Sequence, residues 1–305
     1  MKTAIILATF NGYPMTRACL ASLARLPRER WLLAVADNAS TDGTPERIRE
    51  EFPDVFVFEM GRNLGFGTAN NEAVRRLRKL ASFDTVCFLN NDTLDAAAAL
   101  ETLARALELL GKGKVVLAPK ILSEDGSTQL TYYAEIGLPA FFLNAFRTTA
   151  GASKFLNGKP QKLPGTEFFE SFYTAAVCWL MRLDSFEEIG GFDEQIFMYY
   201  EDVDFGYRAR DLGYKFLIDP KAKLTHLGGG SAQSSLTRSL QHDLSQGYFF
   251  KKRFGRKGWL VSKAFRVVRS AIRILVSLPR LPFSQKTRAY ASMHAKLLAT
   301  ALKIR

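Results

Sequence analysis

Short apolar runs alternate, over the first 122 residues, with stretches whose apolar side chains recur at helical spacing. Each run has the length of a buried strand, and polar or turn-forming residues bound it. The intervening stretches carry apolar residues three or four positions apart, as Ala69, Ala73, Leu77 and Leu80 do. This alternation predicts an α/β fold with a mostly parallel central sheet flanked by helices. The runs are Ala4–Ala8, Trp31–Ala36, Val55–Phe58, Thr85–Leu89 and Val115–Ala118.

The second half of the chain is expected to complete this sheet. Its pattern predicts a central strand over Phe172–Leu183 and a shorter strand over Tyr214–Ile218. Two helices are expected, one capped by Asp184 and one over residues 202–212. Residues 123–170 contain many glycines and prolines, so we expect them to form loops that cover a site.

The basic residues are concentrated at the C-terminal end. Residues 251–305 contain 15 Lys or Arg and neither Asp nor Glu, whereas the first 250 residues carry 27 basic and 30 acidic residues. The net charge of +12 therefore predicts an anionic partner for this end. Apolar residues are interleaved with the cations, so one interpretation is a set of helices that rest on an anionic membrane surface. Helices packed on the body with a solvated basic face, or a nucleic-acid partner, are the alternatives.

No membrane span or disulfide framework is expected. The longest uncharged run, Thr3–Thr16, is shorter than the ~20 apolar residues of a membrane helix. The first residues also lack the features of a signal peptide. Cys19, Cys87 and Cys178 are dispersed in apolar contexts, which is typical of small buried hydrophobes in a reducing compartment. We therefore expect a cytoplasmic protein.

Polar clusters follow the first four expected strands. Ligands of an open parallel sheet bind beyond the carboxyl ends of its strands, so these clusters are expected to meet at one edge. A single cluster of this kind is an ordinary turn, but four in succession favour a small-molecule site. The clusters are residues 9–12, 37–44, 61–70 and 90–92.

Two of these clusters have the chemistry of a phosphate and metal site. The glycine-rich segment 61–67, with Arg62, can bring backbone N–H groups up to phosphates. Neither the dinucleotide fingerprint nor the P-loop spacing is present, which argues against NAD and against a standard P-loop hydrolase. Asp92 suits Mg²⁺ or Mn²⁺, which proteins hold with one or two carboxylates and substrate phosphates. His226 is positioned to reach such a metal, although a lone histidine is more often structural.

Three acids, Glu201, Asp202 and Asp204, follow an aromatic run at the start of the helix expected over 202–212. Negative charge at a helix N-terminus is favourable, and this accounts for one or two of them. Their position after so apolar a run predicts a carboxylate at the wall of a cleft. Such a group is suited to act as a general base.

Taken in order, these segments resemble a known family over residues 3–232. The matching pieces are residues 6–11, 37–44, 62–70, 89–93, 190–194, 200–208 and His226. They resemble glycosyltransferase family 2, whose members are inverting enzymes of the GT-A fold, and in particular its bacterial rhamnosyltransferase-like members. The resemblance implies one GT-A domain over 1–234, with a nucleotide-sugar half (1–122) and an acceptor half (123–234). Residues 235–305 would then form a basic helical extension.

The resemblance implies a role for each matching residue. Asp202 would be the catalytic base, with Glu201, Asp204 and Arg208 orienting the acceptor or supporting the loop. Asp92 would be the last residue of a D-x-D metal motif, and His226 a second ligand for Mn²⁺ or Mg²⁺. The remaining residues would bind the nucleotide sugar. Thr9 and Asp37 would contact the base and ribose, and Arg62, Asn63 and Asn70 would lie near the diphosphate or the sugar. The other residues of the nucleotide-sugar site would be Asn11, Asn38, Asp42, Gly67, Asn91 and Asp92.

The implied reaction transfers a sugar, such as rhamnose, from a dTDP- or UDP-sugar to a saccharide or lipid-linked saccharide, with inversion. It would serve cell-surface polysaccharide synthesis at the inner face of the membrane. Asn90 replaces the first carboxylate of the metal motif, which predicts a modest metal affinity, and Ala175 stands where glycine is common. The alternatives are a nucleic-acid-binding protein that uses the basic end and a glycoside hydrolase that uses paired carboxylates.

Overall fold

The computed structural model describes residues 1–136, 141, 160–228, 235–280 and 284–303. The chain forms two compact units. One, called here the sheet unit, comprises residues 1–133, 159–197 and 201–231. The other, the helical unit, comprises residues 134–158, 198–200 and 232–305. Of the loops expected over 123–170, residues 137–140 and 142–159 lie outside the described part of the chain.

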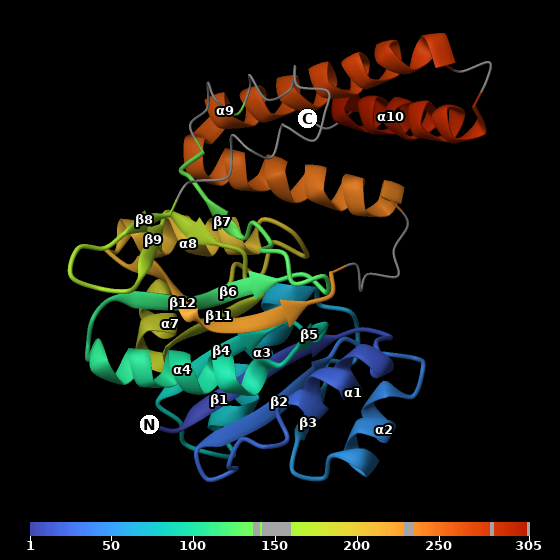
Figure 1. Ribbon diagram of the computed structural model, residues 1–305. Helices are drawn as coiled ribbons and strands as arrows, with labels where there is room; N and C mark the ends of the chain where they lie inside the picture. The colour runs from blue at the N-terminus through green and yellow to red at the C-terminus, as the bar shows by residue number, and fades with distance from the viewer. Residues whose placement is uncertain (137–140, 142–159, 229–234, 281–283, 304–305) are drawn as a thin grey trace. The chain divides into compact units, whose positions relative to one another are not determined.

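The sheet unit contains a ten-stranded sheet with strand order β3-β2-β1-β4-β11-β6-β12-β9-β8, in which β5 pairs with β12 (Figure 1). A two-stranded sheet joins β7 to β10. The strands are β1 (Thr3–Thr9), β2 (Trp31–Asp37), β3 (Phe56–Glu59), β4 (Thr85–Leu89), β5 (Thr93–Leu94), β6 (Val115–Leu122), β7 (Tyr132–Tyr133), β8 (Gln161–Lys162), β9 (Phe169–Ser171), β10 (Tyr173–Thr174), β11 (Cys178–Arg182) and β12 (Lys215–His226).

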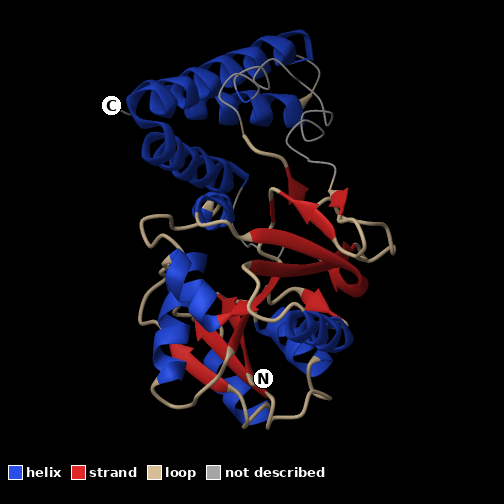
Figure 2. Cartoon of the chain, turned by 90° about the vertical axis from the view of Figure 1, so that its left-hand side faces the viewer, coloured by secondary structure: helices blue, strands red, loops and turns tan. Residues whose placement is uncertain are grey.

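Helices flank this sheet on both faces (Figure 2). Helices α1 and α4 pack with the apolar core of one face, and α3 and α7 contact the strands from the other. The α/β fold with a mostly parallel central sheet is therefore confirmed. The helices of the unit are α1 (Tyr13–Ser22), α2 (Thr44–Glu51), α3 (Phe66–Arg78), α4 (Ala96–Leu109), α7 (Leu183–Ile189) and α8 (Glu201–Asp211).

Strands β3, β2, β1 and β4 are parallel, and β12 runs parallel to β6. The expectation of one strand over Phe172–Leu183 was wrong, because β10 and β11 are separate and join different sheets. Between them, the Ala175 N–H donates to Thr131 O at 2.7 Å, which takes the chain off the line of β11. Strand β11 is antiparallel to both of its neighbours, β4 and β6.

Strand β12 is longer than the expected Tyr214–Ile218, and a register shift between Asp219 and Lys223 interrupts its pairing with β6. The Lys221 N–H donates to Asp219 Oδ1 at 2.9 Å, and this local turn absorbs the extra residues. Asp184 is not the residue that precedes α7, as was expected. The helix begins at Leu183, so Asp184 lies inside its first turn.

Alternate residues of each central strand face opposite sides of the sheet. Ile5 and Leu7 of β1 belong to the core that contains Cys19 of α1, whereas Ala4 and Ile6 face the other side. The three cysteines are buried and free, as expected. Although Cys87 and Cys178 are distant in sequence, their Sγ atoms lie 3.9 Å apart because β4 pairs with β11.

The helical unit contains α9 (Ser235–Ser277), a 3₁₀ turn (Leu278–Arg280) and α10 (Gln285–Lys303), and α9 packs against α10. The expected basic helical extension is therefore present. Gly255 interrupts α9 with φ 62° and ψ −153°, a conformation that residues with a Cβ rarely adopt. None of the helices in the described part of the chain combines the length and hydrophobicity needed to cross a bilayer.

Candidate functional site

The ends of β1 and β2 bring the first two polar clusters together. Thr9 and Asp37 are partners in the parallel register, and the Asn38 N–H donates to Thr9 O at 2.9 Å. Asn91, which follows β4, donates through Nδ2 to the hydroxyls of Thr9 (3.2 Å) and Thr16 (2.9 Å). Residues that follow three different strands thus meet at one sheet edge, as the sequence predicted.

Two amide side chains hold the loops at this edge. Asn11 Oδ1 accepts a hydrogen bond from the Thr41 N–H at 2.7 Å, which ties the loop after β1 to the loop after β2. Asn38 Oδ1 accepts from the Leu64 N–H at 2.9 Å, and this bond ties the loop after β2 to the segment 61–67. Both residues therefore shape the edge through loop contacts, whatever they bind in addition.

Asp37 and Asn70 each carry a buried polar atom that has no hydrogen-bond partner among the described residues. Asp37 Oδ2 accepts from the Ser40 N–H at 2.9 Å, but Asp37 Oδ1 is buried without a hydrogen-bond partner among the described residues. Asn70 Oδ1 is in the same situation, while its Nδ2 donates to Phe66 O at 2.9 Å. Burial raises the pKa of the Asp37 carboxyl. A buried acceptor without a donor loses its hydration energy, so a ligand that donates there would be favoured.

The remaining residues predicted for the nucleotide sugar differ in their surroundings. Asp42 Oδ1 accepts from the N–H (3.1 Å) and the hydroxyl of Thr44, so it supports the start of α2. Asn63 Oδ1 accepts from the Gly65 N–H at 3.0 Å and shapes the glycine segment. Arg62 is exposed at the start of that segment, where its guanidinium can reach a ligand.

The glycine segment lies against the segment that carries the acids. The Phe66 N–H donates to Phe197 O at 3.1 Å. A Cβ on Gly65 would lie 1.8 Å from Phe197 O, so only glycine permits this approach. A Cβ on Gly67 would lie 2.8 Å from Phe192 Cβ and 3.8 Å from Glu201 Cβ. The predicted phosphate segment and the predicted catalytic segment are therefore neighbours.

Asp92 and His226 come together as predicted. His226 Nε2 lies 3.2 Å from Asp92 Oδ1 and 3.4 Å from Asn90 Nδ2. The Leu227 N–H donates to Asp92 O at 2.9 Å, because β5 pairs with the end of β12. Asp92 precedes β5 and His226 ends β12, and the pairing of these two strands explains how residues so distant in sequence meet.

This donor set fits a divalent cation of the Mn²⁺ or Mg²⁺ type. A carboxylate oxygen and an imidazole nitrogen converge within contact distance, and such cations take their remaining ligands from substrate phosphates and water. No group of three or more His, Cys, Asp or Glu side chains among the described residues forms a complete protein cage. The arrangement therefore suits a cation shared between the protein and a phosphorylated substrate.

The acids at the start of α8 have contrasting environments. Glu201 Oε2 is buried without a hydrogen-bond partner among the described residues. Burial and the neighbouring charge of Asp202 raise the pKa of Glu201 to about 8. Asp202 is half-buried, and its Oδ1 accepts from the Val203 N–H at 2.8 Å. At neutral pH, Glu201 therefore holds a proton.

Asp204 and Arg208 support the loop that precedes these acids. Arg208 Nε lies 2.7 Å from Asp204 Oδ2, and its other nitrogens donate to Ile189 O (2.5 Å) and Gly191 O (2.7 Å). The Asp204 side chain of this ion pair is buried, whereas the Arg208 side chain is partly exposed. These hydrogen bonds hold the turn at residues 190–191, and a role in orienting the acceptor or supporting its loop stays a prediction.

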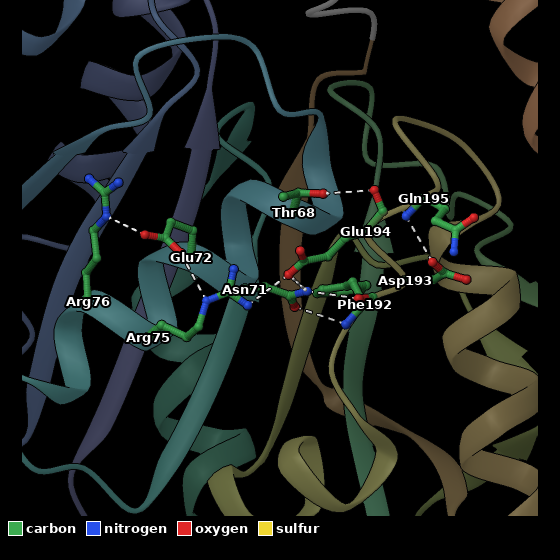
Figure 3. A network of polar contacts seen from close by, with 9 residues as sticks. All are labelled: Thr68, Asn71, Glu72, Arg75, Arg76, Phe192, Asp193, Glu194 and Gln195. Carbon is green, nitrogen blue, oxygen red and sulfur yellow. Dashed lines mark hydrogen bonds and ion pairs between the residues drawn. The ribbon is translucent and has the colours of Figure 1, made fainter.

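Sequence reasoning missed Asn71, which joins α3 to the same turn (Figure 3). Its Nδ2 donates to Phe192 O at 2.8 Å and to Glu194 Oε1 at 3.0 Å, and its Oδ1 accepts from the Phe192 N–H at 3.0 Å. Arg75 adds an ion pair with Glu194 at 2.8 Å. A buried amide on the core side of an amphipathic helix was the available signal.

Two further residues were missed because their contacts are distant in sequence. Gln129 Oε1 lies 2.9 Å from His226 Nδ1, and Gln129 Nε2 donates to His226 O at 2.6 Å. Tyr133 lies close enough to Asp202 to feel its charge, and burial together with that charge raises the pKa of Tyr133 to about 12. Its ring stacks on Tyr173 with centroids 4.9 Å apart. Nothing in the local pattern around either residue marks it as part of a site.

Comparisons with known proteins agree with this geometry. The model of the family described as Glycosyl transferase family 2 matches residues 4–190. An N-acetylglucosaminyl-diphospho-decaprenol L-rhamnosyltransferase of Mycobacterium tuberculosis is 29% identical over 234 residues, which are 73% of this chain and 75% of the relative.

Two solved structures share the fold. A mannosyltransferase of Pyrobaculum calidifontis, in complex with GDP-Man and Mn²⁺, has a TM-score of 0.55 at 17% identity, over 99% of this chain and 86% of the other. Staphylococcus aureus TarS (residues 1–349) has a TM-score of 0.54 at 17% identity, over 99% and 92%. Both likenesses concern the GT-A fold.

Proposed function

Since the chain belongs to glycosyl transferase family 2 and is therefore a glycosyltransferase, we propose that it transfers rhamnose or a related sugar to a lipid-linked saccharide. The donor would be a dTDP- or UDP-sugar, and the acceptor a hydroxyl of the saccharide. The name of the mycobacterial relative supports both the sugar and the diphosphate-linked lipid. Family membership favours sugar transfer over the glycoside hydrolase alternative.

The donor would bind along the sheet edge. Asp37 Oδ1, buried without a partner among the described residues, is suited to accept a hydrogen bond from the base, and Thr9 lies beside it in the register. Arg62 and the backbone of the glycine segment would hold the diphosphate. Asn70 Oδ1 is a second buried acceptor, suited to a hydroxyl of the donor sugar.

Asp92 and His226 would hold a divalent cation, Mn²⁺ or Mg²⁺, at the diphosphate. When bound, such a cation supplies positive charge that offsets the charge of the departing nucleoside diphosphate. Asn90, in place of a carboxylate, leaves one anionic ligand fewer on this strand, so the metal affinity is expected to depend on the bound diphosphate.

Asp202 would act as the general base. It takes the proton of the acceptor hydroxyl while the acceptor oxygen forms a bond to the anomeric carbon of the donor. The bond between that carbon and the diphosphate oxygen breaks with its electron pair, and the attack from the opposite face inverts the configuration. Glu201 is protonated at neutral pH, so it adds no second negative charge beside the proposed base.

The helical unit would rest on the inner face of the cell membrane. Exposed cations and exposed apolar side chains share its helices, as Lys251 and Leu260 of α9 illustrate. An anionic surface attracts such cations by ~1 kcal/mol each. A lipid-linked acceptor is held at that surface, so a peripheral enzyme would meet it there. The product would serve the synthesis of a cell-surface polysaccharide.

One observation carries the proposal: the glycine segment contacts the segment of the acids, through Phe66 N–H to Phe197 O at 3.1 Å.

The test incubates the full chain with dTDP-rhamnose or a UDP-sugar, Mn²⁺ and a polyprenyl diphosphate-linked saccharide. We expect glycosylated lipid and one nucleoside diphosphate per transfer, and NMR of the product should show the inverted anomer. Failure of every donor to react in the presence of acceptor and metal would sink the proposal.

A further inference from the structure

The helical unit contains a cavity of 340 Å³, lined by side chains of α9 and α10 and by Tyr199. Its lining is unusually cationic, because five of the side chains are arginine or histidine and one is a carboxylate. These charged and titratable residues are Arg238, His242, Asp243, Arg269, Arg273 and His294.

The single carboxylate of the lining is already paired. Arg269 Nη2 lies 2.8 and 3.0 Å from the two oxygens of Asp243. Arg273 donates to the neutral hydroxyl of Tyr290 at 2.6 Å. Neither Arg238 nor Arg273 has an ion pair with a carboxylate of the described residues. The cavity therefore carries an excess of positive charge.

Two buried groups next to this charge have unused hydrogen-bonding atoms. Arg266 is 1% exposed and donates through Nη1 to Asp243 O at 2.9 Å, but its Nη2 has no partner among the described residues. His294 lines the cavity, is 6% exposed, and its Nδ1 is likewise without a partner. Burial and the charges of Arg269 and Arg273 lower the pKa of His294 to about 4, so it is neutral at pH 7.

Arg238 and Arg273 are partly buried and lack a carboxylate partner among the described residues, so an anion in the cavity would offset the cost of their charge. The geometry points to a phosphate site in the helical unit, whose ligand is the diphosphate of the lipid-linked acceptor. Arg238 and Arg273 supply the charge, and the neutral His294 supplies a hydrogen bond. This assignment rests on the proposed function, because it takes the acceptor to be a lipid diphosphate.

The surroundings favour a lipid over a free phosphate. Leu275, Val276 and Leu278, which follow Arg273 along the chain, are 62%, 57% and 49% exposed. Apolar side chains this exposed are suited to contact the hydrocarbon of a lipid or of the membrane. The cavity thus offers cations for a diphosphate, next in sequence to apolar groups for the chain attached to it.

The cavity is also linked to the catalytic segment through the chain. Tyr199 lines it and precedes Asp202 by three residues. Tyr199 and Tyr200 both have positive φ, 64° and 69°, so this connection is a tight turn.

The test titrates inorganic pyrophosphate into the full chain by calorimetry, with EDTA present to remove divalent cations. We expect Arg238→Gln and Arg273→Gln each to weaken binding at least tenfold. Arg256→Gln, which removes an exposed cation of α9 outside the cavity, should leave binding unchanged. Unchanged binding in both cavity variants, or an equal loss in the control, would overturn the site. Matching circular dichroism and melting curves establish that the variants are folded.

A second arm identifies the source of the phosphate. Phosphatidylcholine vesicles carry either a polyprenyl diphosphate or phosphatidylglycerol, and flotation measures binding of the wild type and Arg273→Gln. We expect the variant to lose binding to the diphosphate vesicles alone, and an equal loss on both would overturn the assignment to a diphosphate. Binding of dTDP or UDP with Mn²⁺ is measured in parallel. If neither nucleotide binds, the proposed function fails, while the pyrophosphate result still decides whether the cavity is an anion site.

Discussion

Gln129 holds His226 at two points, with Gln129 Oε1 2.9 Å from His226 Nδ1 and Gln129 Nε2 2.6 Å from His226 O. Because the amide oxygen accepts only from a protonated nitrogen, this contact places the ring proton on Nδ1. The other ring nitrogen, Nε2, lies 3.2 Å from Asp92 Oδ1. Gln129 would therefore orient the imidazole toward the metal that we propose at Asp92.

Replacing Gln129 should therefore weaken the binding of Mn²⁺. Residues that orient a metal-binding histidine typically contribute 10–100-fold to affinity, and we expect Gln129→Ala to lose ~10-fold or more. Calorimetry or the EPR signal of free Mn²⁺, with dTDP or UDP present, measures the loss. Gln161→Ala, an exposed position on β8, is the control. Equal affinity in Gln129→Ala and wild type would exclude this orienting role.

Asp202→Asn should abolish sugar transfer while nucleotide binding is retained. The amide has the same shape but does not accept the acceptor proton at neutral pH, and general-base assistance is typically worth 10²–10⁴ in rate. We expect a loss of about that size in the transfer rate, with the Kd for the nucleoside diphosphate within about twofold of wild type. Transfer at the wild-type rate would remove Asp202 from the role of base.

Glu201 should make the stability of the protein depend on pH. Burial and Asp202 raise the pKa of Glu201 from 4.5 to about 8, so the folded state holds this proton more tightly than the unfolded state. The contribution of this bound proton to the free energy of unfolding is complete below pH 4.5 and is lost as the pH rises toward 8. Glu201→Gln removes this loss, so its melting temperature should exceed that of the wild type by more at pH 8 than at pH 5. Each kcal/mol corresponds to roughly 2–4 °C for a domain of this size.

The pH series needs a control for the other titrating groups. Glu167→Gln changes an exposed carboxylate and should leave the pH dependence of the melting temperature as in the wild type. A constant difference between Glu201→Gln and wild type across the pH range would show that Glu201 does not ionise in this interval.

The sequence predicted the residues at the sheet edge better than the strands and side chains that hold them in place. The polar ends of β1, β2 and β4 could be located because a buried strand followed by Asn, Asp or Gly is a local pattern, and Thr9, Asp37 and Asn91 meet as expected. The position of β11 in the sheet could not be predicted, because an apolar run does not reveal whether its strand pairs in a parallel or an antiparallel direction. Gln129 was missed since its role is set by a contact 97 residues away.

The contact between the glycine segment and Phe197 can be tested with two glycines that both have positive φ. Gly65 and Gly61 have φ of 80° and 70°, so alanine is strained at both, and more so at Gly65, whose ψ of −176° places it in a region that only glycine adopts readily. Only at Gly65 does a Cβ overlap the Phe197 carbonyl, whereas at Gly61 it meets nothing within 4 Å. We expect Gly65→Ala to lose donor binding and considerably more stability than Gly61→Ala. Similar melting temperatures and donor affinities for the two variants would contradict the close approach.

The exposed cations of α9 should determine binding to anionic membranes. Lys251, Lys252, Arg256 and Lys257 are exposed, and each cation near an anionic surface contributes ~1 kcal/mol. Replacing the four by Gln should weaken flotation with phosphatidylglycerol vesicles by well over tenfold, and 0.5 M salt should weaken the wild type in the same direction. Glutamine at four exposed cations of the sheet unit, Arg25, Arg62, Lys79 and Lys112, should have little effect. Salt-sensitive binding of DNA with no binding of vesicles would instead support the nucleic-acid alternative, because counterion release gives that interaction its own steep salt dependence.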